Sequence, residues 1–283
     1  MTDVVASVRS LGGIPGVGER IDAAREACTQ LRWHQALRRR TPEAAAESRV
    51  RGAWATAELD GARSTADLVR DLMRGARAWP EQLDPVEQVL RGAISATAET
   101  EHIRSLVTRA PLQALARLHV AAAADFVPAD QLGRPRVGDE TSEEFADLGS
   151  PPAADEVAAR LDAVVQVLLR HGELPTVLVA AVVHAEIATV RPFVRGNGLV
   201  GRAMERAVVQ ACGLDPTGVS VPEAGHRTRG GPAYLGALTA YGTGSRKGVG
   251  LWLEHCADAI AAGAAEGVRI ADAVLAGHLT SPA

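Results

Sequence analysis

The residues with the clearest chemical potential lie in one short stretch, residues 191–202, which reads RPFVRGNGLVGR. Gly196 and Gly198 tolerate backbone angles that let successive amide groups point toward one spot. The helix expected after the turn directs its positive end at the same spot, and Asn197 can add a side-chain donor. This pattern predicts an anion site that suits a phosphate group.

Two arginines flank the turn. Arg195 lies just before it and Arg202 one turn into the following helix, so both could bring positive charge to a bound anion. Nearly every cation of the chain is an arginine, however, with Lys247 as the only lysine, so a single arginine is weak support for binding. From the loop alone, a plain connector between two helices, with its arginines in solvent, is the favoured interpretation, and only the surrounding sequence changes that.

The elements that must position this loop are predicted to be helices. Residues 176–190 form an apolar run that is too short for a membrane span, and we expect a buried helix there. Arg191 precedes a proline, which favours an extended backbone and should end that helix. A second helix is expected over residues 199–212, and Asp84 followed by Pro85 should open another. Few segments alternate like a strand, so the fold class is all-α.

Residues 128–152 interrupt the helical pattern. This segment, PADQLGRPRVGDETSEEFADLGSPP, holds many turn-forming and acidic residues. Such a composition is typical of an exposed flap, which could form a short β-hairpin.

The bulk composition narrows the class of protein. The 283 residues allow one large domain or two small ones, and the net charge of -4 gives no reason to expect a nucleic-acid partner. The N-terminal residues lack the pattern of a secretory signal, and no membrane span is expected. Cys28, Cys212 and Cys256 lie far apart, with neither the spacing of metal ligands nor that of a disulfide framework. We therefore expect a cytoplasmic protein without a metal site; its oligomeric state is open.

The loop resembles the signature motif of the Fic family of AMP-transferring enzymes, HPFxxGNGRxxR. The similarity extends in order and spacing over about residues 50–255. The positions that keep the pattern of the loop are Pro192, Phe193, Gly196, Asn197, Gly198, Gly201 and Arg202. Weaker likenesses lie at residues 133–136, 151–152, 180–184, 234–238 and 252. The resemblance implies a helical region over residues 1–110, a Fic-like core over residues 111–260 and a helical tail over residues 261–283.

A second match lies at residues 56–61, TAELDG, which resembles the inhibitory motif of the family. The resemblance implies a helix near residues 52–62 in which Thr56, Asp60 and Gly61 are regulatory. Asp60 would pair with Arg202 and keep an ATP γ-phosphate from settling productively. Aspartate is one methylene shorter than the glutamate of the family, so a looser or water-bridged pair is expected. A helix with a mildly polar face is the alternative.

The chemistry of the motif is not kept. Arg191 stands where the family has the histidine that acts as general base, and a guanidinium cannot accept a proton near neutral pH. Arg195 replaces the acidic residue that holds Mg²⁺ and would repel the metal. Leu199 replaces a phosphate-binding arginine. The two new arginines could neutralise phosphates without a metal ion, or they could be neutral changes in an arginine-rich chain.

Two histidines are candidates for a replacement base. His184 lies within the apolar run, where we expect a core histidine satisfied by a backbone partner. His226 lies in a glycine-rich segment that we expect to be mobile, and nothing in the sequence requires it at the site. No catalytic residue is therefore predicted.

These observations predict a degenerate Fic-family protein that binds a nucleotide such as ATP, or another phosphate-bearing ligand, with little or no AMP transfer. A target protein could be a further partner. One alternative is an active AMP transferase, and another is a structural interaction protein with an empty cradle. The expected phosphate-binding residues are Phe193, Arg195, Gly196, Asn197, Gly198 and Arg202.

Overall fold

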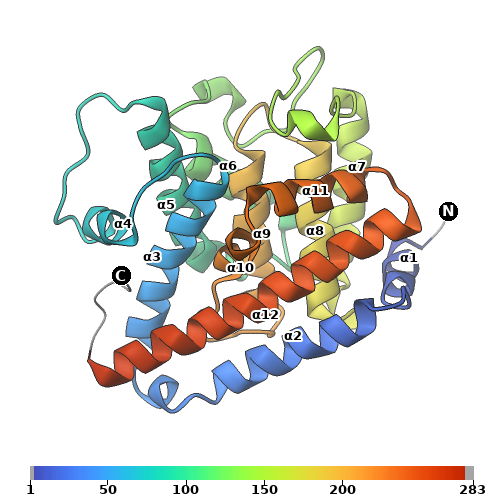
Figure 1. Ribbon diagram of the computed structural model, residues 1–283. Coiled ribbons are helices and arrows are strands. Elements are labelled where there is room, and N and C mark those ends of the chain that lie inside the picture. Colours follow the sequence, from blue (N-terminus) through green and yellow to red (C-terminus); the bar gives the residue numbers. More distant parts are fainter. Residues whose placement is uncertain (1–2, 278–283) are drawn as a thin grey trace.

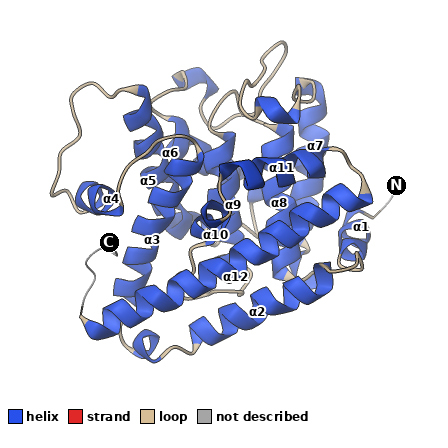
Figure 2. Ribbon diagram, viewed as in Figure 1, coloured by secondary structure: helices blue, strands red, loops and turns tan. Residues whose placement is uncertain are grey.

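The computed structural model describes residues 3–277, and helices account for all the regular structure in that range (Figures 1 and 2). The predicted all-α fold class is confirmed. The α-helices are α1 (Val4–Leu11), α2 (Val17–Arg32), α3 (Thr41–Leu59), α4 (Ala66–Met73), α5 (Pro85–Ile103), α6 (Pro111–Ala123), α7 (Ala154–Leu169), α8 (Thr176–Val190), α9 (Asn197–Ala211), α10 (Pro222–Thr228), α11 (Gly231–Gly242) and α12 (Arg246–Ala276).

Helix α8 lies at the centre of the molecule and packs against α9, the helix that follows the candidate loop. Twelve of its fifteen residues are buried. A helix that is apolar on every side has to be covered on every side. The longest helix, α12, crosses the molecule with α2 alongside it (Figure 1). Together these helices fix the position of the α8–α9 loop.

The core depends on close backbone contacts, because only 3% of the residues are aromatic. At the crossing of α10 and α12, a Cβ atom added to Gly225 would lie 1.9 Å from the carbonyl oxygen of Ala259. A Cβ on Gly263 would lie 2.6 Å from the carbonyl carbon of Val221. These two glycines let the helices approach more closely than any other residue would allow.

Several predicted boundaries agree with the structure. Helix α8 covers residues 176–190, as expected. Helix α5 begins at Pro85, and its N-cap residue Asp84 forms a capping box with Glu87.

Two other boundaries differ from the expected ones. The helix expected over residues 52–62 is the end of α3, which stops at Leu59. The division expected between residues 260 and 261 falls within α12, which runs unbroken through it.

The flap at residues 128–152 contains two single 3₁₀ turns, at Ala129–Gln131 and Ala146–Leu148, and no strand. The β-hairpin that its composition allowed is absent. Arginine side chains hold the segment in place of cross-strand pairing. Arg136 donates hydrogen bonds to the carbonyl oxygens of Glu140, Pro152, Val190 and Arg191. The flap is therefore fixed onto the α8–α9 loop.

None of the helices within residues 3–277 combines the length and the apolar character needed to cross a lipid bilayer.

The α10–α12 crossing generates a stability prediction. Gly225→Ala should destabilise the protein by about 1–3 kcal/mol, because the new methyl group overlaps the backbone of α12. Gly236→Ala in α11 is the matched control, since an added Cβ there meets no atom within 4 Å. The control should be neutral or should stabilise by up to about 1 kcal/mol. Urea unfolding measures both changes, and equal stabilities would contradict this account of the crossing.

Candidate functional site

The loop begins with an unusual backbone conformation. Arg191 follows α8 with φ 47° and ψ 63°, in the left-handed region, so the extended conformation expected before a proline is wrong. A non-glycine residue pays about 1–2 kcal/mol for this conformation. Two hydrogen bonds offset that cost: the amide of Arg191 donates to the Ile187 carbonyl at 3.0 Å, and Arg136 Nε donates to the Arg191 carbonyl at 2.7 Å. The helix still ends at Val190, as predicted.

The two glycines of the turn have different roles. Gly196 has φ 89° and forms the N-cap of α9, so it needs the freedom of glycine. Gly198 has a helical backbone conformation, and its missing side chain leaves room for Asp60 and Phe145. A Cβ atom there would lie 2.9 Å from Asp60 Oδ1 and 3.2 Å from the ring of Phe145.

The side chain of Asn197 closes the loop on itself. Its Oδ1 accepts a hydrogen bond from the Phe193 amide at 2.9 Å, and its Nδ2 donates to the Phe193 carbonyl at 2.8 Å. His119 supports the loop from α6: its ring stacks on Phe193 with centroids 3.8 Å apart, and its Nε2 donates to the Arg195 carbonyl at 3.0 Å. Burial lowers the pKa of His119 to about 4, so this ring is neutral at pH 7.

A carboxylate of the chain itself occupies the predicted anion cradle. Glu144, in the flap, accepts hydrogen bonds from the Gly196 amide at 2.6 Å and from the Asn197 amide and Nδ2, both at 2.8 Å. Burial, followed by the negative charge of Asp60, raises the pKa of Glu144 despite these bonds. Three donors at the start of α9 therefore converge on one anionic group.

Glu144 was missed by the sequence reasoning. The flap contains four acids within six positions, Asp139, Glu140, Glu143 and Glu144. Their spacing does not distinguish the acid whose side chain turns inward. Glu144 reaches the start of α9 because of the path that the flap backbone takes over the loop.

Arg202 is fully buried and binds the end of α3. Its Nε donates to Thr56 Oγ1 at 2.6 Å, and its Nη2 donates to Asp60 Oδ1 at 2.5 Å. The contact with Asp60 is direct, although a looser or water-bridged pair was expected. Asp60 lies just beyond α3 as its C-cap, and Gly61 follows with φ 84°. The two motifs recognised in the sequence thus meet in space.

A cavity of about 370 Å³ opens beside the cradle. Its lining includes three of the expected phosphate-binding residues, Arg195, Gly196 and Gly198, together with Asp60 and Glu144. Phe193, Asn197 and Arg202 do not line it. No histidine borders this cavity among the described residues. The guanidinium of Arg195 lies 4.9 Å above the ring of Phe126.

Arg191 does not line this cavity. Its Nη1 donates to the carbonyl oxygens of Glu144 at 2.9 Å and Phe145 at 3.4 Å, so it holds the backbone of the flap. Burial and the nearby charge of Arg136 lower the pKa of Arg191, but a guanidinium remains charged at neutral pH. Arg191 and Arg136 together place the Glu144 carboxylate over the cradle.

The two other histidines differ from expectation. His184 is a buried core residue as predicted, but its partners are the side chains of Glu205 and Tyr234 in place of a backbone group. His226 lies in α10 and is fully buried, so the mobile segment expected around it is wrong. The sequence of α10 resembles that of a loop because the helix is short and contains Gly225, the residue at which it crosses α12.

The role of Arg191 generates a prediction about the flap. Arg191→Ala removes two hydrogen bonds, each worth about 0.5–1.5 kcal/mol, and should raise amide hydrogen exchange over residues 140–149 by about tenfold or more. Arg195→Ala is the control, because this arginine precedes the same turn without bonding to the flap backbone. Similar exchange in both variants would show that Arg191 does not hold the flap.

Comparisons with known proteins agree with this arrangement. Residues 107–208 match the model of the Fic/DOC family. No curated protein matches the chain as a sequence. Among solved structures, a Fic family protein from Desulfovibrio desulfuricans shares 20% identity, with a TM-score of 0.71, over 94% of this chain and 76% of that chain. Fic-1 from C. elegans (residues 134–508) shares 14% identity, with a TM-score of 0.64, over 92% and 73%.

A Fic-domain signalling protein from Bacteroides thetaiotaomicron also has a TM-score of 0.64, at 11% identity, over 93% of this chain and all of that one. At these identities the likeness establishes the fold. The family match covers α6, α7, α8 and most of α9, the part of the chain that holds the flap, the loop and the cradle. Residues 107–208 therefore match the Fic/DOC family, within a chain that has the fold of the Fic structures.

Proposed function

We propose that this chain is a degenerate Fic protein that binds the phosphate of a nucleotide, or of another phosphate-bearing ligand, at the start of α9. The observation that carries the proposal is the Glu144 carboxylate, held by three donors at 2.6–2.8 Å. Backbone amides at a helix N-terminus bind phosphate and carboxylate oxygens in the same way. The carboxylate stands where a phosphate group would bind.

Binding would require the flap to move. A phosphate oxygen can take the three donors only when Glu144 leaves them, because two anions cannot share them. Asp60 meanwhile neutralises Arg202, the arginine that the family resemblance assigns to phosphate. Two carboxylates of the chain thus compete with the ligand. The cavity of about 370 Å³ lies toward the small end of the range for ligand sites.

The same geometry argues against AMP transfer. The base position holds Arg191, whose guanidinium binds the flap. Loss of a general base typically lowers a rate by about 10²–10⁴. The position of the acidic Mg²⁺ ligand holds Arg195, and the turn offers N–H donors where Mg²⁺ needs oxygen atoms. The loop therefore does not fit Mg²⁺.

An active transferase is the second candidate. Three carboxylates, Asp60, Glu144 and Asp147, line the cavity. One of them could accept the proton of a target hydroxyl group once a ligand has opened the flap. Catalysis by this route would have to proceed without the histidine of the family motif.

The first test removes the competing anion. Glu144→Gln replaces the carboxylate by a neutral amide, whose NH₂ group is repelled by the cradle donors. Affinity for ATP and for inorganic phosphate should rise by about 10-fold or more, since a hydrogen bond to a charged group contributes about 1.5–3 kcal/mol. Isothermal titration calorimetry, with and without Mg²⁺, measures the change.

Glu143→Gln is the matched control, because it removes the neighbouring, exposed acid of the same flap. Tighter, metal-independent binding in the Glu144 variant alone supports the proposal. Strictly Mg²⁺-dependent binding would favour the transferase. If neither the native chain nor the Glu144→Gln or Glu143→Gln variant bound ATP or phosphate, a structural interaction protein with an unused cradle would be favoured.

The second test rebuilds the family motif. The changes Arg191→His, Arg195→Asp and Leu199→Arg, combined with Asp60→Ala, restore the base, the metal ligand and the phosphate-binding arginine and remove the proposed restraint. We expect auto-modification with labelled ATP and Mg²⁺ in this variant and none in the native chain. The same variant without Arg191→His should be slower by about 10²–10⁴. Robust labelling of the native chain would overturn the degenerate assignment.

A further inference from the structure

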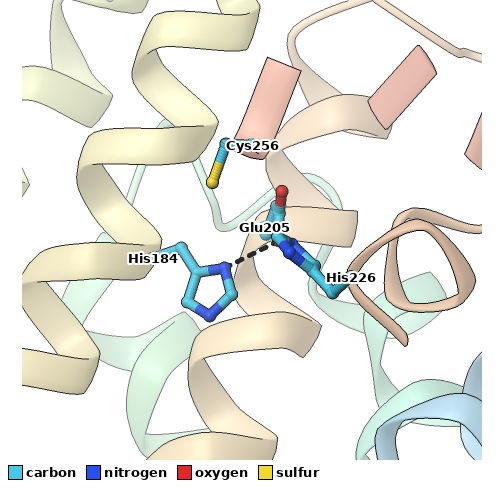
Figure 3. A group of neighbouring side chains, drawn as sticks. All are labelled: His184, Glu205, His226 and Cys256. Atoms are coloured by element: carbon cyan, nitrogen blue, oxygen red, sulfur yellow. Dashed lines mark hydrogen bonds and ion pairs between the residues drawn. The ribbon is translucent and has the colours of Figure 1, made fainter. Parts of the chain in front are cut away.

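Behind the loop, four helices each contribute one polar side chain to a single buried cluster. His184 comes from α8, Glu205 from α9, His226 from α10 and Cys256 from α12, and Figure 3 shows the four gathered in one place. Each offers one atom that can bind a metal ion, and these atoms all lie within 4.8 Å of one another. All four side chains are completely buried. None of them lines the cavity beside the cradle.

The carboxylate at the centre of this cluster has an unsatisfied oxygen. Glu205 Oε2 lies 2.7 Å from both His184 Nδ1 and His226 Nε2. Glu205 Oε1 is buried without any hydrogen-bond partner. Such an orphaned oxygen is rare in native proteins and points to a bound ion or water.

Glu205 has no arginine or lysine as an ion-pair partner among the described residues; its contacts are with His184 and His226. The nearby arginines of α9 are paired elsewhere, Arg202 with Asp60 and Arg206 with Glu223. A buried carboxylate oxygen without a partner, as Oε1 of Glu205 is, is unfavourable unless an ion or water binds it.

Cys256 completes the set of candidate ligands. Its thiol is completely buried and lies within 4.8 Å of the ligand atoms of the other three residues. A coordinated metal ion deprotonates a thiol, and a divalent cation would neutralise both the thiolate and the carboxylate.

We propose that His184, Glu205, His226 and Cys256 form a structural zinc site. Two imidazole nitrogens, one carboxylate oxygen and one thiolate sulfur suit the tetrahedral preference of Zn²⁺, whereas Mg²⁺ and Ca²⁺ prefer oxygen atoms alone. Zinc bonds of about 2.0–2.3 Å place ligand atoms roughly 3.3–3.8 Å apart. On binding zinc, the two distances of 2.7 Å from Glu205 Oε2 to the histidine nitrogens would therefore lengthen. The longest distances between ligand atoms, up to 4.8 Å, would shorten.

The outer contacts of both histidines fit metal ligation. A histidine that binds a metal through one ring nitrogen usually hydrogen-bonds through the other, which fixes its tautomer. The second nitrogen of His184 lies 2.8 Å from Tyr234 Oη, and that of His226 lies 3.1 Å from His255 Nε2. Tyr234 Oη also accepts a hydrogen bond from Arg202 Nη1 at 3.3 Å. The zinc site would thus be joined to the buried guanidinium of the signature loop.

The four ligands leave no position open for a substrate, which is characteristic of a structural site. The metal would tie together α8, α9, α10 and α12. Its ligands escaped the sequence analysis because neighbouring ligands lie 21 or more positions apart along the chain. No short ligand spacing marks them.

The test begins with the native chain, produced in zinc-supplemented medium and dialysed without a chelator. Mass spectrometry of the metal content should find about one zinc ion per chain, as four ligands from one chain complete a site. Replacement by Co²⁺ should give the visible bands of a tetrahedral site and a near-ultraviolet band from the thiolate. Absence of stoichiometric metal, with no Zn²⁺ taken from a chromophoric chelator, would overturn the proposal.

Variants then identify the ligands. Cys256→Ser should remove the thiolate band. Loss of an outer contact typically weakens metal binding by about 10- to 100-fold, and loss of this ligand should weaken Zn²⁺ binding by more than that. Cys28→Ser is the control, because Cys28 is a buried free cysteine outside the cluster. Equal effects of the two changes, or a Co²⁺ spectrum without a thiolate band in the native chain, would refute the assignment. The spectrum of the native chain keeps the test decisive even where a variant fails to fold.

Discussion

The interaction on which the site depends is the buried guanidinium of Arg202. It extends from the first turns of α9 and donates to Thr56 and Asp60 at the end of α3 and to Tyr234 in α11. A buried guanidinium is tolerated only when its N–H groups are satisfied, so this one residue fixes the mutual position of three helices. The direction of α9, and hence of the amides at its start, follows from that constraint.

Most of the fold could be predicted because its signals are local. The apolar run of residues 176–190 gave the bounds of the central helix, and the Asp84–Pro85 pair marked the start of α5. The meeting of Asp60 with Arg202 was suggested by a resemblance of two motifs. Each of these signals lies in a few consecutive residues or in a known pattern.

The features that the sequence did not predict depend on how segments distant in the chain pack together. The spacing of residues along the chain carries no information on such packing. The left-handed backbone of Arg191 is stabilised by Arg136, a residue of the flap. The inward turn of Glu144 depends on arginine contacts with the flap backbone. The cluster around Glu205 joins four helices. His226 appeared to lie in a flexible segment because glycine marks both loops and close helix crossings, and here Gly225 serves a crossing.

The way in which the flap is attached bears on how this protein can diverge. Arg136 and Arg191 bind carbonyl oxygens, and every residue type carries the same carbonyl group. Most flap side chains can therefore change without loosening the attachment, provided that the backbone keeps its path. Such a segment can acquire new surface chemistry over evolutionary time while the loop beneath it stays unchanged. The binding preferences of related chains could then differ through the flap alone.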